Sequence, residues 1–293
     1  ENIGLCNVMC VNLLELDDGR IAFVFAVKSG QVPGEFDCRP FIKYSTDSCL
    51  TWSEPTAMSP DANRYYVLEN SRLIQLSNGR ILFPIALLIA TNPWWFAGCC
   101  VYSDDSGESW KVGEFAAARD YPIAGFVENG VVEIDTSRRT VRGASRQNTV
   151  EPVVLMYARS SRGEILHCFS VNGGITWSEP EPLGPKSPIS PSMVKRIPST
   201  GDLLLIWNAV DRRTAHPQWR SPLTAAISKD EGQTWINMRD IEPNIETTYC
   251  YPSLAFTRED TVVLTYYRGE HIDGGQHNLR EMVVRVLPVS WFY

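Results

Sequence analysis

The octapeptide Ser103-Asp104-Asp105-Ser106-Gly107-Glu108-Ser109-Trp110 decides the fold, because the chain contains it four times. The other copies are residues 45–52, 170–177 and 228–235, and all follow Ser-x-Asp/Asn-x-Gly-x-Thr/Ser-Trp except that Cys49 takes the glycine position of the first. Asp, Asn and hydroxyl side chains can hydrogen-bond the nearby backbone, and glycine permits a positive φ. Since an apolar run precedes each copy, the pattern predicts one β-hairpin turn used four times.

The spacing of the copies indicates a structural repeat. They begin at residues 45, 103, 170 and 228, so successive copies are 58, 67 and 58 residues apart. A second pattern, LELDDGRI at residues 14–21, recurs as IQLSNGRI at residues 74–81 and more loosely at 197–205 and 256–264. Each of these reads as strand, polar turn, strand. One repeat therefore predicts a four-stranded antiparallel sheet.

Five such repeats can be delimited, at residues 8–55, 66–112, 125–180, 188–240 and 247–293. Their even spacing favours a single domain over residues 1–293. We expect the octapeptide tryptophans to be largely buried at equivalent places in successive repeats. These are Trp52, Trp110, Trp177 and Trp235.

Composition is that of a soluble globular protein, with 44% apolar and 21% charged residues. The net charge of −7 argues against a nucleic acid as partner, because there is no basic excess to neutralise phosphates. An anionic small ligand needs only a local cluster of basic residues. The eight cysteines form no paired CxxC set, and reduced, mostly buried thiols are expected. There is no metal motif or phosphate loop, so no cofactor is predicted.

Residues 81–103 contain no charged side chain and are a candidate membrane span. Pro84 and the Asn92-Pro93 pair interrupt this run, whereas a spanning helix needs about 20 continuous apolar residues. Two buried strands joined by a turn are predicted instead, with residues 94–96 (Trp-Trp-Phe) as core or as an apolar wall for a ligand. No signal peptide is visible, and a start at Glu1 rather than Met is consistent with removal of an upstream segment.

The repeated octapeptide resembles the Asp-box of the sialidase (neuraminidase) superfamily, whose members are six-bladed β-propellers. The resemblance covers nearly the whole chain. It implies an all-β propeller of four-stranded antiparallel blades, with about five blades present. Met9 stands where the family places the first arginine of its carboxylate-binding triad. The resemblance therefore implies that the chain begins at the family's second blade, without the blade that usually carries the acid/base aspartate.

Two further segments resemble the family's catalytic positions. VENGVVE at residues 127–133 is similar to its Asn-Glu-x-x-Val-Val-Glu stretch, which makes Glu128 the partner of the catalytic tyrosine. Tyr251 matches the nucleophile of the family's Tyr-Ser-x-Leu, although Pro252 replaces the serine, and Tyr249 is the alternative. The structural alternatives are an exposed strand-end carboxylate and a core tyrosine.

The resemblance also implies substrate-binding arginines. Arg159 and Arg220 precede the third and fourth boxes at similar offsets and resemble the second and third arginines of the triad. Arg162, Arg212 and Arg213 are competitors that are more typical of solvated loops.

Residues of the first two repeats provide three more candidates. Asp37 is a candidate proton donor or arginine partner, and Arg39 and Arg72 are candidate substrate-binding residues. The histidines, in contrast, look scattered in sequence and form no Ser-His-Asp pattern. They are His167, His216, His271 and His277.

These residue types suit one chemistry. Sialic acid carries a carboxylate on the carbon that is attacked, which would repel an Asp or Glu nucleophile, and sialidases use tyrosine instead. A neighbouring Glu can accept the tyrosine proton, and arginines bind a carboxylate bidentately. The expected function is an exo-α-sialidase-like glycoside hydrolase that releases terminal sialic acid or a related acidic sugar from glycans. The alternative is a non-catalytic propeller that binds glycan or protein.

Overall fold

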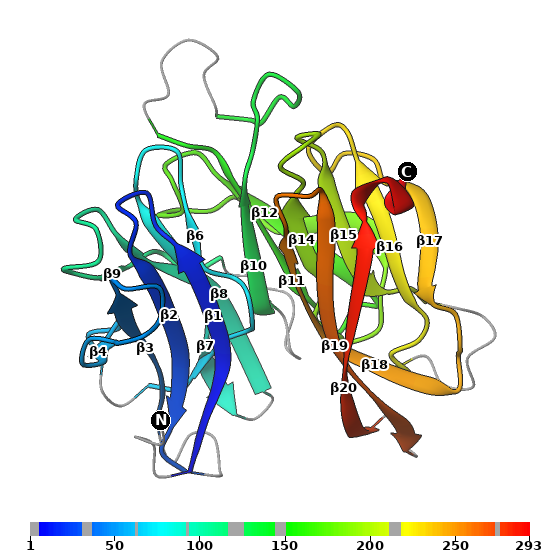
Figure 1. The fold of residues 1–293 in the computed structure, drawn as a ribbon, viewed down its shortest axis with the longest axis horizontal. Coiled ribbons are helices and arrows are strands. Elements are labelled where there is room, and N and C mark those ends of the chain that lie inside the picture. The colour runs from blue at the N-terminus through cyan, green and yellow to red at the C-terminus, as the bar shows by residue number, and fades with distance from the viewer. Residues whose placement is uncertain are drawn as a thin grey trace. The chain divides into compact units, whose positions relative to one another are not determined.

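A computed structural model describes residues 6–30, 37–61, 64–91, 94–116, 126–143, 151–210, 218–272 and 276–293. The predicted all-β class is confirmed: five small antiparallel sheets of propeller-blade type are found in these residues (Figure 1). The chain divides into two compact units. The first comprises Glu1–Glu133, Arg142–Met156 and Cys168–Pro180, and the second comprises Ile134–Val141, Tyr157–His167 and Glu181–Tyr293. The single domain over residues 1–293 stays a prediction.

The first unit contains two sheets with a shared apolar core. One has the order β1-β2-β3-β4, formed by Asn7–Glu15, Ile21–Lys28, Cys38–Ser45 and Thr56–Ala57. The other has the order β5-β7-β8-β9, formed by Tyr66–Val67, Ile81–Thr91, Trp94–Ser103 and Lys111–Val112, and β6 (Ile74–Gln75) also pairs with β7. Val24, Ile42 and Phe83 are among the fully buried residues that join the two sheets.

The third sheet has the order β10-β11-β12-β13, and its residues are divided between the units. β10 (Val127–Glu133) belongs to the first unit and β13 (Glu181–Lys186) to the second. β11 (Val154–Arg159) and β12 (Glu164–Ser170) each contain residues of both.

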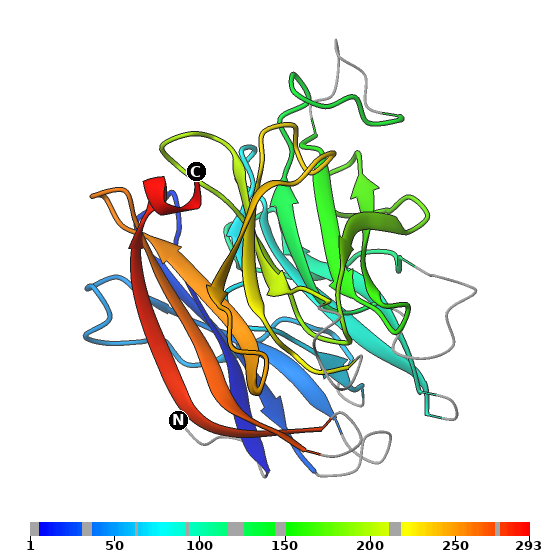
Figure 2. The same ribbon diagram turned by 90° about the vertical axis from the view of Figure 1, so that its right-hand side faces the viewer.

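The second unit contains the fourth and fifth sheets. The fourth has the order β14-β15-β16-β17, formed by Met193–Arg196, Leu203–Asn208, Leu223–Ser228 and Ile236–Glu242. In the described residues the fifth has three strands rather than four: β18 (Thr247–Phe256), β19 (Thr261–Ile272) and β20 (Gln276–Pro288), followed by the 3₁₀ helix η2 (Val289–Phe292). Figure 2 shows β19 and β20 as a long hairpin, coloured orange to red.

The octapeptide forms the predicted turn in all four copies. Each box begins at the last residue of a strand: β3, β8, β12 and β16 end at Ser45, Ser103, Ser170 and Ser228. In the second box, Ser103 Oγ donates to Asp105 Oδ1 (2.7 Å) and accepts from the Gly107 N–H (2.8 Å). Asp105 in turn accepts from the Ser109 N–H (2.9 Å). These bonds tie the serine and the aspartate of the box to its own backbone.

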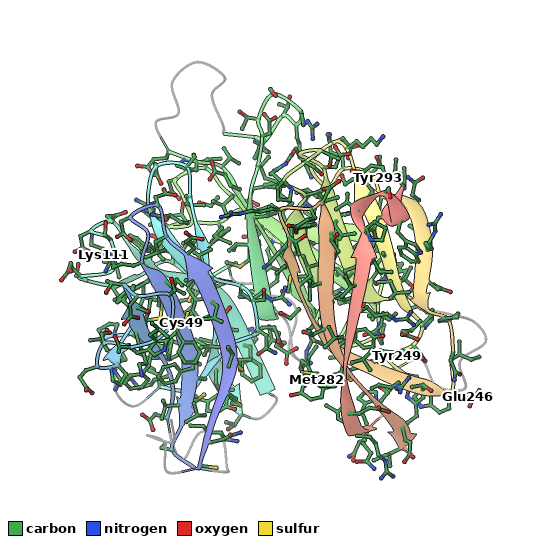
Figure 3. The ribbon with its side chains drawn as sticks, in the orientation of Figure 1. Cys49, Lys111, Glu246, Tyr249, Met282 and Tyr293 are labelled. Atoms are coloured by element: carbon green, nitrogen blue, oxygen red, sulfur yellow. The ribbon has the colours of Figure 1, made fainter. Side chains whose placement is uncertain are left out.

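The backbone explains the glycine position of the box. Two successive residues of every copy lie in the left-handed region, with φ between 57° and 90°. They are Ser48-Cys49, Ser106-Gly107, Gly173-Gly174 and Glu231-Gly232. Cys49 adopts a φ of 70°, which a residue with a Cβ resists. Figure 3 labels this side chain, which belongs to the turn after β3.

The octapeptide tryptophans were expected to be largely buried, and each is only partly exposed: Trp52, Trp110, Trp177 and Trp235. Trp110 packs against the core of the first unit, and the indole N–H groups of Trp110, Trp177 and Trp235 are buried. Because each box follows the end of a strand, its tryptophan covers a surface turn rather than the interior of a sheet. The four tryptophans occupy the same position in their boxes.

Both other local predictions are confirmed. The polar turns at Gly19 and Gly79 join β1 to β2 and β6 to β7, and each is closed by a hydrogen bond from the glycine N–H to the leucine three residues earlier (2.8 Å). The uncharged run at residues 81–103 forms β7 and β8, paired from Ile81↔Ser103 to Thr91↔Trp94. Trp95 and Phe96 are half-buried. The described part of the chain holds no helix with the length and apolar character to cross a membrane.

Candidate active site

Three blade-opening strands carry the same backbone irregularity. Cys10 in β1, Glu128 in β10 and Tyr251 in β18 have φ values of 62°, 53° and 58°. The pairing register shifts between Met9 and Asn12 in β1, and between Cys250 and Ser253 in β18, as in a β-bulge. A non-glycine residue with positive φ is uncommon, and such strain often lies at functional sites. Both predicted catalytic residues, Glu128 and Tyr251, occupy these positions.

The bulge in β18 separates the two candidate tyrosines. Tyr249, labelled in Figure 3, is buried in the core of the second unit. Its ring meets that of Tyr266 edge-on, with ring centres 6.0 Å apart. Tyr251 is half-buried. Of the pair, Tyr251 therefore fits a role at a ligand, and Tyr249 has the structural role of a core tyrosine.

Arg220 lies against Tyr251. Its guanidinium carbon is 5.5 Å from the centre of the Tyr251 ring, and its Nη1 donates to Cys250 Sγ at 3.4 Å. Its backbone C=O accepts from the Tyr249 N–H at 2.9 Å, which ties the segment before β16 to the start of β18. Because Arg220 is only 9% exposed, the surrounding protein holds its side chain in place.

Arg159 is the last residue of β11 and is half-buried. Arg220 and Arg159 act on the same histidine: burial and the charges of Arg220, His271 and Arg159 lower the pKa of His277 to about 4. Arg162 is exposed, as expected of a solvated competitor. Arg212 and Arg213 lie outside the described residues. In the second unit, Arg220 therefore lies beside Tyr251, and both Arg220 and Arg159 are near enough to His277 to affect its pKa.

Two histidines that look scattered in sequence also belong to this region, and the sequence analysis missed them. His271 and His277 are directly opposite each other on β19 and β20, with their rings edge-to-face at 5.9 Å. The intervening sequence, Ile-Asp-Gly-Gly-Gln, contains the Asp-Gly and Gly-Gly pairs typical of hairpin turns. That signal could have placed the two histidines side by side.

Glu128 belongs to the first unit and is buried, at 8% exposure, rather than an exposed strand-end carboxylate. A second buried carboxylate, Glu69, lies in its electrostatic neighbourhood. Burial together with Glu69, Cys38 and Glu128 raises the pKa of the Cys10 thiol well above its usual range. Glu69 accepts from the backbone and side-chain amides of Asn70 (2.7 and 2.8 Å). The sequence analysis did not select Glu69.

The remaining candidates lie in the first unit with local contacts. Arg72 is 2% exposed, and its backbone N–H donates to the side chain of Asn12. Arg39 donates to the Ser59 C=O (2.9 Å) and lies over the Phe41 ring. Asp37 uses its backbone to bond Ser29. For Arg39 and Asp37, these contacts fit the stabilisation of the first sheet.

Comparisons with known proteins bear on the family and the fold. The family model for the BNR repeat-like domain matches residues 8–264. A sialidase from Micromonospora viridifaciens is 26% identical over 277 residues, which are 86% of this chain and 38% of that protein. The chain thus spans less than two fifths of the length of this relative.

Two solved structures share the fold. A protein of unknown function from Dyadobacter fermentans has a TM-score of 0.65 at 20% identity, over 96% of this chain and 77% of that one. A Hadza microbial sialidase also has a TM-score of 0.65, at 18% identity, over 89% of this chain and 50% of that one. With a family match over most of its length and sialidase relatives, the chain belongs to the family of BNR repeat-like domains.

Proposed function

We propose that the protein is an exo-sialidase-like glycoside hydrolase that acts on terminal sialic acid or a related acidic sugar. The observation that carries the proposal is the pairing of Arg220 with Tyr251, 5.5 Å from guanidinium carbon to ring centre, at the bulge of β18. A buried arginine beside a half-buried tyrosine in strained backbone supplies a carboxylate-binding group next to a nucleophile. Arg159 supplies a second positive charge in the same unit.

The proposed reaction follows from the charges. The sugar carboxylate pairs with the guanidinium groups of Arg220 and Arg159. The Tyr251 oxygen forms a bond to the anomeric carbon as the glycosidic C–O bond breaks, and the departing oxygen takes a proton. We retain Glu128 as the acceptor of the tyrosine proton, on the sequence match. Water then replaces the tyrosine and releases the free sugar.

The test is release of the fluorophore from a fluorogenic sialoside by the wild-type chain and by Tyr251→Phe. The substitution keeps the ring and its packing but removes the nucleophilic oxygen. We expect kcat to fall by about 10³-fold or more, with an unchanged circular dichroism spectrum. Glu128→Gln should also slow turnover, because an amide cannot take the tyrosine proton.

The matched control is Tyr249→Phe, two residues away on the same strand and in the core. Its turnover should stay within about twofold of wild type. Equal turnover by Tyr251→Phe and wild type would disprove the assigned nucleophile. Glycan binding without cleavage of any sialoside would instead favour the binding-module function.

A further inference from the structure

His271 and His277, at the end of the β19–β20 hairpin, are held in place by contacts with neighbouring residues. His271 stacks on Trp219 with ring centres 4.1 Å apart and planes 3° from parallel. Its Nε2 lies 3.1 Å from Ser221 Oγ, whose single hydrogen is donated to the Ile245 C=O (2.9 Å). The Nε2–H of His271 therefore donates to the serine. These contacts fix His271, which in turn packs edge-on against His277.

His277 is oriented by a buried hydroxyl. Its Nδ1 is 2.9 Å from Oγ1 of Thr248, a residue with no exposed surface. Among the residues that the structure describes, Nε2 of His277 has no hydrogen-bond partner, and the ring is half-buried. Nε2 is therefore the ring nitrogen that a ligand can reach.

Contacts join His277 to Arg220: Thr248 Oγ1, which bonds His277 Nδ1, lies 3.7 Å from Cys250 Sγ, and this sulfur accepts from Arg220 Nη1. Arg220 precedes β16, His271 lies opposite on β19, Arg159 ends β11, and Thr248 of β18 is neutral. Burial and these positive charges lower the pKa of His277 to about 4. A carboxylate bound to the arginines would cancel part of that charge and move the pKa back toward its usual value near 6.5.

We propose that His277 is the proton-transfer residue of this site, which gains a proton when a sugar carboxylate binds Arg220 and Arg159 and gives it to the departing oxygen. This inference rests on the proposed function. As the glycosidic C–O bond breaks, the Nε2–H proton passes to the leaving oxygen, which departs as an alcohol. In the second step, neutral His277 accepts a proton from the attacking water as the bond to Tyr251 breaks. The ring is then protonated again, and it loses this proton when the product sugar and its carboxylate leave the arginines.

The first test measures proton uptake on binding. Free N-acetylneuraminic acid is titrated into the full chain at pH 5.5, by calorimetry in two buffers of different ionisation enthalpy. Wild type should take up a substantial fraction of one proton per sugar bound. His277→Asn keeps an amide near the Nδ1 position for Thr248 but cannot be protonated, so the uptake should disappear.

His167→Asn is the matched control. Burial and the charge of Arg139 lower the pKa of His167 to about 4 as well, but its Nδ1 bonds the Glu181 C=O on the neighbouring strand. The control should retain wild-type proton uptake. Thr248→Val, which removes only the orienting hydroxyl, is the second variant should His277→Asn fail to fold, and it should give a smaller uptake than wild type.

The second test compares leaving groups. Proton donation matters most for a poor leaving group, so His277→Asn should lose about 10²- to 10⁴-fold in kcat on sialyllactose and much less on a sialoside with a phenolic leaving group. A merely structural role would reduce both equally. Unchanged proton uptake, or equal losses on both substrates, in an active enzyme would overturn the assignment of His277 alone. A wild-type chain that neither binds the sugar nor cleaves either substrate would overturn the proposed function with it.

Discussion

The box turns and the left-handed residues of the blade-opening strands both recur along the chain, but a different feature recurs in each. The four boxes keep an opening serine, an Asp or Asn two residues later and the hydrogen bond between these two side chains. Strands β1, β10 and β18 each keep one left-handed residue, but its side chain differs: Cys10, Glu128 and Tyr251. A position where side chain and backbone recur together serves the fold. A position where only the backbone recurs can present different chemistry in each blade.

The largest effect that tests this contrast is expected near the β18 bulge. Arg220→Lys keeps one charge but loses the planar fork that binds a carboxylate through two N–H groups. On a fluorogenic sialoside we expect kcat/KM to fall by about 10- to 100-fold, mainly through a higher KM. The exposed Arg162→Lys, three residues after Arg159, should leave kcat/KM within about twofold. Similar losses in both variants would argue against a specific role for Arg220.

The contrast also explains what the sequence could predict. The box turns could be predicted from sequence because their residues act locally. The serine, for example, accepts a hydrogen bond from the backbone N–H four residues later. The left-handed residues of the opening strands could not be predicted, because none of Cys10, Glu128 and Tyr251 is a residue type that favours positive φ. Family resemblance selected Glu128 and Tyr251 by sequence alone. His271 and His277 were missed because their neighbourhood depends on strand register, which six-residue spacing alone does not reveal.

Removal of a box hydroxyl should give the next largest effect, now on stability. Ser103 is 1% exposed, and Ser103→Ala leaves the Gly107 N–H without its acceptor and removes one of the donors to Asp105. We expect a loss of about 1–3 kcal/mol in the free energy of unfolding, measured by urea denaturation. Ser106→Ala, in the same box but exposed, should change it by less than about 0.5 kcal/mol. Equal effects would show that the internal hydrogen bonds of the box do not stabilise it.

A substitution in the first box, where Cys49 takes the glycine position, should raise the free energy of unfolding. Cys49 has a φ of 70° and an exposed side chain, so Cys49→Gly removes strain without opening a core cavity. The expected gain is about 0.5–1 kcal/mol, read from the urea midpoint. The reverse change, Gly107→Ala, should destabilise, because φ is 90° there and a Cβ would overlap the hydroxyl of Tyr44. A destabilised Cys49→Gly would mean that the thiol has a contact of its own.

The smallest expected effect is a pH dependence of stability, which should differ between boxes that contain Asp and the box that contains Asn. Hydrogen bonds from Thr51 and Ser45 lower the pKa of Asp47 to about 2, and bonds from Ser109 and Ser103 do the same for Asp105. Both carboxylates have a folded-state pKa below the unfolded value near 3.8, so their contribution is complete above pH 4 and is lost as the pH falls toward 2. The third box carries Asn172 instead and does not titrate.

Asp105→Asn converts a charged box into the neutral type. Asn172 shows that an amide fits: its Oδ1 accepts from the Thr176 N–H and its Nδ2 donates to Thr176 Oγ1, both at 2.9 Å. The variant should be less stable than wild type at pH 7, because a carboxylate accepts stronger hydrogen bonds than an amide oxygen. The gap between their urea midpoints should narrow from pH 4 to pH 2, as Asp105 becomes protonated. A gap that stays constant over this range would show that the charge of Asp105 does not stabilise the turn, and that geometry alone accounts for the recurrence of Asp in three of the four boxes.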